Sequence, residues 1–139
     1  MTLDELEREG YIKRLPVDKK KVEDALNIAK RDIKVAKSVL REDDDWAFSI
    51  AYNAMLQAIR ALMFSKGYRP SGRNQHISVV MFAELFLRRE EVIVLDRMRR
   101  KRHATIYDTA GTISEKEAEN AVERAEKLIR EIERMLKGD

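Results

Sequence analysis

The stretch from Trp46 to Phe64, "WAFSIAYNAMLQAIRALMF", decides the fold. It is rich in alanine, and its apolar residues lie on nearly every side of the helix that its period predicts. Small side chains let neighbouring helices approach closely, so we expect this helix at the centre of a bundle. The acidic run Asp43–Asp45 caps its positive end, and Gly67 suits the position just after its last turn.

The segments on either side carry the signals of further helices. Asp18 is a good N-cap, and the pairs Thr2 with Glu5 and Ser114 with Glu117 have the spacing of capping boxes. Residues 67–75 contain Gly, Pro and Ser and are expected to form a loop. In order along the chain, we predict helices at about residues 2–9, 19–41, 44–66, 76–87, 90–108 and 115–136.

The predicted fold class is all-α, an up-and-down bundle of four main helices plus a shorter one, in a single domain over residues 1–139. The chain has no Cys and only two histidines, His76 and His103, so we predict no disulfide, no metal site and no cofactor. No apolar run approaches the roughly 18 residues of a membrane span, and the acidic N-terminus is unlike a signal peptide. We therefore expect a cytoplasmic protein without a membrane partner.

Charged residues make up 38% of the chain, but the net charge is only +3. This balance argues against a general polyanion binder, so any contact with nucleic acid must come from local clusters. One such cluster is "RMRRKRHATIYD", Arg97–Asp108, which places five cations in its first six residues. The helical positions of these cations determine which of them face the interior.

On a helical wheel, Arg102 lies in the middle of the inward stripe, whereas Arg97, Arg100 and Lys101 point to solvent. A guanidinium cannot shed its proton, so a buried Arg102 needs acceptors. The candidates are Asn53, the acids Asp43–Asp45, a backbone carbonyl or a bound anion. The sequence leaves two readings open, a structural pair between helices and a functional anion site.

His103 and Tyr107 are four residues apart and share a helix face, with Asp96 and Arg99 on the same flank. These groups could perform acid–base chemistry on a phosphodiester. The alternative is a half-exposed histidine and a tyrosine that packs at the edge of the bundle, because no nucleophile or metal set accompanies them. His76 is expected to serve as a cap or a packing residue.

The alanine-rich helix, the "SKGYRP" loop, the His-led helix, "RMRRKRHATIYD" and "ISEKEAENAVERAEKLI" together resemble the HEPN (higher eukaryotes and prokaryotes nucleotide-binding) family over about residues 18–136. The chain looks most like the small stand-alone prokaryotic members. The resemblance implies a helical bundle that forms a homodimer with a cleft between protomers. It also implies one of three roles: a metal-independent ribonuclease, a non-catalytic RNA binder, or the partner of a small nucleotidyltransferase in a toxin–antitoxin pair.

Active ribonucleases of the family carry an Arg, usually followed by a polar residue and then by a His. Arg97 with His103 fits this spacing, but Arg102 with His103 as its polar follower fits the inward orientation better. Tyr107 then occupies the place of the catalytic His, and a tyrosine is a poor general base at neutral pH. The candidate catalytic residues are His103, Arg102 and Tyr107, and the candidate RNA- or nucleotide-binding residues are Arg102, Asn53, Arg99 and Arg97.

We accordingly expect first an RNA- or nucleotide-binding protein, the helical partner of a nucleotidyltransferase. An active endoribonuclease is the second hypothesis, and a non-enzymatic interaction module is the third. The sequence adds modest support for the homodimer, because "VVMFAELFL", residues 79–87, is more apolar than one face of a bundle requires.

Overall fold

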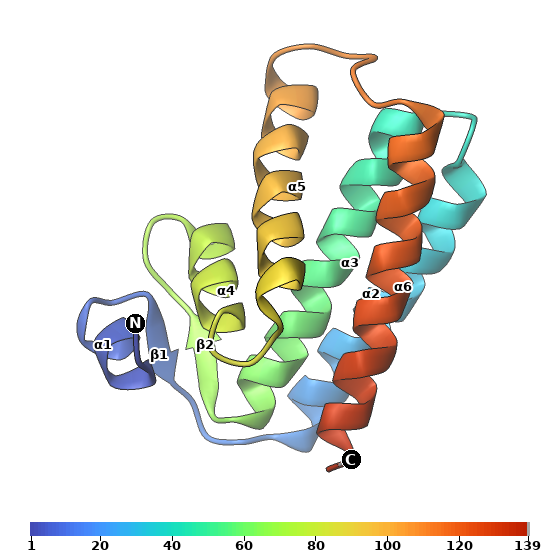
Figure 1. The fold of residues 1–139 in the computed structure, drawn as a ribbon. Coiled ribbons are helices and arrows are strands. Elements are labelled where there is room, and N and C mark those ends of the chain that lie inside the picture. Colours follow the sequence, from blue (N-terminus) through green and yellow to red (C-terminus); the bar gives the residue numbers. More distant parts are fainter. Residues whose placement is uncertain (139) are drawn as a thin grey trace.

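A computed structural model describes residues 1–138. Within these residues, six helices and two short strands follow one another (Figure 1). They are α1 (Leu3–Arg8), β1 (Ile12–Arg14), α2 (Lys19–Val39), α3 (Asp44–Ser65), β2 (Tyr68–Pro70), α4 (Gln75–Ala83), α5 (Arg89–Tyr107) and α6 (Glu115–Leu136). The predicted all-α bundle of four main helices and a shorter one is confirmed.

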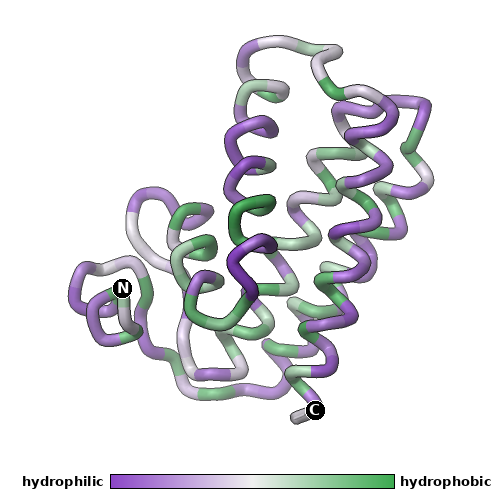
Figure 2. Tube along the Cα trace, in the orientation of Figure 1, coloured by the Kyte–Doolittle hydropathy of each residue, from purple (hydrophilic) through white to green (hydrophobic). Residues whose placement is uncertain are grey.

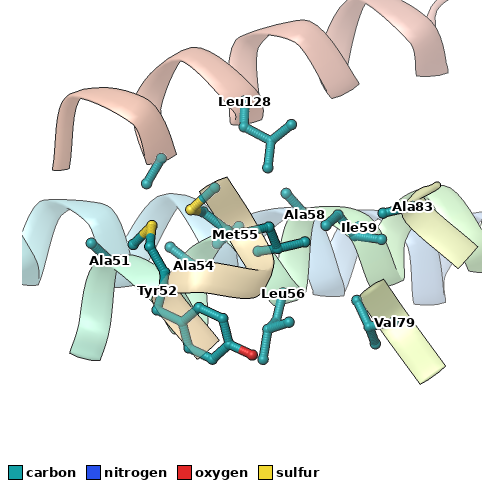
Figure 3. Packing of buried hydrophobic residues seen from close by; sticks show 14 of the residues in the cluster. Ala51, Tyr52, Ala54, Met55, Leu56, Ala58, Ile59, Val79, Ala83 and Leu128 are labelled. Atoms are coloured by element: carbon teal, nitrogen blue, oxygen red, sulfur yellow. The ribbon is translucent and has the colours of Figure 1, made fainter. Parts of the chain in front are cut away.

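Helix α3 is the central element, as predicted. It packs against α2 and α6 as well as against α4 and α5, and α4 also packs against α5. Ala51, Ala54 and Ala58 of α3 are fully buried, which lets the neighbouring helices lie close to its backbone. In Figure 3, Leu128 of α6 lies above α3, and Tyr52 extends to the side away from Leu128. The site described below is built on that side.

The helix ends follow the predicted chemistry. Asp18 and Asp43 are the N-caps of α2 and α3, and Thr2 and Ser114 form capping boxes with Glu5 and Glu117. Gly67 follows the C-cap of α3 with a φ of 83°. A side chain at this position would place its Cβ 3.3 Å from the carbonyl oxygen of Leu15, so glycine suits both the turn and the close approach.

The N-terminal residues form a small unit against the β2–α4 loop. β1 pairs with β2 in antiparallel register, with Ile12 opposite Pro70. Leu6 of α1 and Ile12 of β1 are fully buried. The prediction of a simple loop over residues 67–75 was wrong at β2, because a three-residue strand carries no periodic signal and its partner strand lies far away in the sequence.

Helix α4 is shorter than predicted and ends at Ala83. The amides of Leu85 and Phe86 donate to carbonyls three residues earlier, so the chain tightens into a turn before α5. Most of the apolar stretch 79–87 is buried within the chain, at Val79, Val80, Phe82, Ala83 and Leu87. This stretch therefore gives no separate support for the homodimer, which stays a prediction.

Along α5, strongly hydrophilic turns follow an apolar turn, and the last turn is less hydrophilic (Figure 2). Among residues 1–138, no helix combines the length and the apolar character that crossing a bilayer requires.

Candidate functional site

An open cavity of about 300 Å³ lies between the start of α4 and the second half of α5. Four of the predicted site residues line it together. The lining residues are Asn74, His76, Arg99, Arg102, His103 and Tyr107. The start of α4 and the second half of α5 thus bring together residues from two separate segments of the chain.

Arg102 is half-buried at the cavity, with its Cζ 5.7 Å from the centre of the Tyr52 ring. This guanidinium stacks on the aromatic face, but its buried Nε has no hydrogen-bond partner. Among residues 1–138, no carboxylate forms a salt bridge with it. The inward orientation predicted for Arg102 is therefore found without the structural ion pair that was the alternative reading.

The protein partners considered for Arg102 are engaged elsewhere. The amide of Asn53 donates to the carboxylate of Asp32 over 2.7 Å, so Asn53 does not line the cavity. Asp43 and Asp44 accept from the backbone amides of Trp46 and Arg41, and Asp45 accepts from the α5–α6 loop. The predicted contact between Arg102 and Asn53 or these acids is corrected, because each has a closer partner of its own.

The ring of Tyr52 lies against the guanidinium of Arg102, and its hydroxyl contacts His76. Its side chain is fully buried, and its hydroxyl lies 3.3 Å from Nδ1 of His76. Burial raises the pKa of Tyr52 well above its ordinary value, so the phenol keeps its proton. Burial, aided by Arg102 and Arg99, lowers the pKa of His76, so this imidazole is neutral at neutral pH.

The other cations of α5 differ in whether they pair with a carboxylate and in whether they line the cavity. Arg99 lines the cavity but pairs with Asp96 over 3.0 Å, and Arg100 lies 3.6 Å from the same carboxylate. Arg97 is exposed and does not line the cavity. Of the predicted binding residues, Arg102 and Arg99 therefore share the cavity, and Arg97 lies outside it.

His103 and Tyr107 are on the exposed side of the same cavity. Their ring centres lie 4.8 Å apart, and Tyr107 is 67% exposed. The helical spacing predicted that these two side chains share a face, and the structure places them so. The imidazole and the phenol are thus open to solvent beside the two guanidiniums of the cavity.

Two cavity residues were not predicted to belong to the site. His76 was expected to serve as a cap or a packing residue, and no role in the cavity was predicted for Asn74. Asn74 caps α4, because its side chain accepts from the amide of Ile77 over 3.1 Å. Nothing in the sequence indicates that the start of α4 lies beside Arg99 and Arg102, so the spacing of either segment alone could not reveal this contact.

The arrangement suits an anion. One guanidinium has no protein partner, a second is only partly neutralised, and the N-terminus of α4 adds the positive end of its dipole. Among residues 1–138, no group of three or more His, Asp and Glu side chains could hold a metal ion. The cationic groups at this cavity are able to hold an anion through hydrogen bonds and charge.

Comparisons with known proteins agree with this fold. A family model described as "HEPN domain" matches residues 22–135. The crystal structure of TT1696 from Thermus thermophilus superposes with a TM-score of 0.63 at 22% sequence identity. The match covers 82% of this chain and 97% of TT1696, so the two share a fold. No curated protein matches the sequence.

Proposed function

Because this chain belongs to the HEPN domain family, we propose that it binds RNA or a nucleotide and that Arg102 holds a phosphate in the cavity between α4 and α5. The single observation behind this proposal is a half-buried guanidinium without a protein acceptor at the edge of an open cavity. Burying such a group without a partner is costly, and a phosphate oxygen satisfies both its charge and its hydrogen bonds.

A pair of variants on α5 tests the role of Arg102. Arg102→Ala and Arg97→Ala each remove one positive charge, but Arg97 is exposed outside the cavity. We expect Arg102→Ala to weaken binding of a short single-stranded RNA by about tenfold or more, as for the loss of a charged hydrogen bond. Arg97→Ala should weaken it only slightly, through the long-range charge. Equal losses in the two variants, measured by fluorescence anisotropy, would contradict the proposal.

Salt dependence gives a second test of the same site. If Arg102 contacts a phosphate, the logarithm of the binding constant should fall linearly with the logarithm of the salt concentration. Removing Arg102 should reduce the slope by about one phosphate contact. Binding that does not change with salt would rule out a phosphate anchor.

An endoribonuclease is the alternative function, and His103 is the observation that favours it. This imidazole lines the cavity beside Arg99 and Arg102, where it could take the proton of a ribose 2′-hydroxyl. The expected product is a cyclic phosphate formed without metal. Loss of cleavage in His103→Ala supports the activity, whereas cleavage that survives in this variant removes the proposed base.

We further propose a homodimer and a nucleotidyltransferase partner of the toxin–antitoxin type as the setting for this binding site. The resemblance to the HEPN family motivates this setting, since some members of that family are partners of a small nucleotidyltransferase. Co-purification with the product of a neighbouring gene, in a sample without nuclease activity, would support it. A monomer that binds RNA without any partner protein would instead favour a stand-alone binder.

A further inference from the structure

We propose that Tyr52 fixes His76 in the tautomer with its proton on Nε2, so that His76 offers a neutral N–H donor to an anion held by Arg102. This inference rests on the proposed function, because it assigns a second ligand contact in the same cavity. The two residues come from different elements, Tyr52 from the middle of α3 and His76 from the first turn of α4.

The hydroxyl of Tyr52 determines the tautomer. Tyr52 is 0% exposed, and residues 1–138 offer its hydroxyl no hydrogen-bond partner other than Nδ1 of His76. If Nδ1 carried the ring proton, the phenol proton would be buried without an acceptor. Donation from Tyr52 to an unprotonated Nδ1 leaves no donor unsatisfied. The proton of the neutral ring is then on Nε2.

The surroundings of His76 keep the ring neutral. It faces Arg99 and Arg102 on α5 and the protonated phenol of Tyr52 on α3, and Asp96 is already paired with Arg99. Burial and the two guanidiniums lower its pKa, as described above. His76 therefore contributes a hydrogen bond to the cavity and no charge.

The tautomer also divides the roles of the two histidines. His76 lines the cavity, and Nε2 is the ring nitrogen that Tyr52 leaves for a ligand. A nitrogen that already carries a proton, on a ring whose other nitrogen accepts from Tyr52, cannot act as a general base. Any proton abstraction in this cavity falls to His103, while His76 positions the ligand.

Nuclear magnetic resonance can read the tautomer directly. The chain has two histidines, so ¹⁵N-labelled protein gives two ring spin systems, and His103→Asn leaves one to assign. At neutral pH we expect the Nδ1 of His76 at the shift of an unprotonated nitrogen and Nε2 at that of a protonated one. The Nε2–H form should exceed the other by about tenfold or more, given the cost of an unsatisfied buried donor. An Nδ1–H form or an imidazolium at neutral pH would overturn the proposal.

Tyr52→Phe tests whether the phenol sets the tautomer. The ring beneath Arg102 is kept, and only the hydroxyl is removed. We expect the two tautomers of His76 to become mixed, in a variant whose circular dichroism shows an intact helical fold. This readout would not respond to a purely structural role of Tyr52. An unchanged preference for Nε2–H would mean that Tyr52 does not position His76.

Sulfate, whose charge is constant near neutral pH, tests the ligand contact. In the wild-type protein we expect sulfate to shift the Nε2–H signal of His76 together with the Nε–H signal of Arg102. His76→Gln retains an amide donor and should keep most of the affinity, whereas His76→Leu should lose about tenfold. A shift at Arg102 without one at His76 overturns this inference and leaves the proposed function standing. No shift at either residue removes the proposed anion site as well.

Discussion

Asp32 is a carboxylate that is only 6% exposed, and its hydrogen bonds are therefore expected to matter for stability. One oxygen accepts from the amide of Asn53 over 2.7 Å, and the other accepts from Arg31. This contact ties α2 to α3 at a distance from the cavity. The polar residue in the middle of the apolar helix thus holds two helices in register.

Replacement of Asn53 separates stability from binding. Asn53→Ala leaves one oxygen of Asp32 without its partner, which should lower the free energy of unfolding by about 1–3 kcal/mol. RNA binding should be unaffected, because Asn53 does not line the cavity. Urea unfolding and anisotropy titration measure the two effects. A large loss of affinity without loss of stability would return Asn53 to the binding site.

His76 should make stability depend on pH. Its pKa is lowered in the folded protein by burial, Arg102 and Arg99, so the unfolded chain takes up a proton at a higher pH than the folded one. Stability is fully present above the ordinary histidine value of 6.5 and is lost as pH falls from there through the lowered pKa. His76→Gln should show a shallower decline between about pH 7 and 5 in chemical unfolding. Parallel declines would show that another group is responsible.

Helical geometry predicted that Arg102 faces the interior, but it could not predict that His76 lies beside it in the cavity. The wheel of a single helix determines which residues point inward, so Arg102, His103 and Tyr107 could be grouped from the sequence. The partner that a residue finds on another helix depends on how the helices pack, which no single wheel contains. Asn53 was correctly identified as a residue that needs a partner, but the partner is Asp32.

The N-terminal unit, α1 with β1, is an element that lies outside the matched HEPN region yet supports the site. The amide of Ser71 donates to the carbonyl of Tyr11, and the hydroxyl of Ser71 donates to that of Gly10. The hydroxyl of the buried Ser78, in α4, donates in turn to the carbonyl of Ser71 over 2.8 Å. The unit thereby holds the loop before α4, next to Asn74 and to the first turn of α4 that carries His76.

Leu6→Ala tests this support. The fully buried side chain leaves a cavity between α1 and its neighbours, and such changes cost about 2–5 kcal/mol. We expect the loss to be local, because α1 packs mainly on β1 and α4. Hydrogen exchange should accelerate at the amides of Tyr11 and Ser71, which donate to the carbonyls of Leu6 and Tyr11, and stay slow in α3. Uniform acceleration throughout the bundle would mean that the unit is part of one cooperative core.

The elements that could be predicted are those whose ends carry chemical signals. Asp18, Asp43 and Ser114 lie where their helices begin, since each supplies an acceptor to unpaired amides of the first turn. β1 and β2 carry no such signal, and each exists only because the other lies beside it. The long helices, whose ends are marked by nearby capping residues, could therefore be predicted. The two strands, which depend on a partner far away in the sequence, could not.

For the molecule as a whole, the close packing around α3 is expected to make larger side chains on this helix destabilising. Ala58→Leu adds three carbons at a position with 0% exposure, and overpacking of this kind costs about 1–3 kcal/mol. Ala104→Leu on the exposed face of α5 is the matched control and should change stability little. Thermal unfolding of the two variants compares them. Similar melting temperatures would show that the core yields to the larger side chain.

The position of α3 has a consequence for how such a chain can diverge. Tyr52 contacts Arg102 and His76 on one side of α3, whereas Leu128 of α6 lies over the opposite side (Figure 3). Substitutions that change the cavity need not disturb the packing on the opposite side of α3, and substitutions in that packing need not alter the cavity. The same helix thus carries a cavity on one side and part of the core on the other, so the two can accept substitutions separately over evolutionary time.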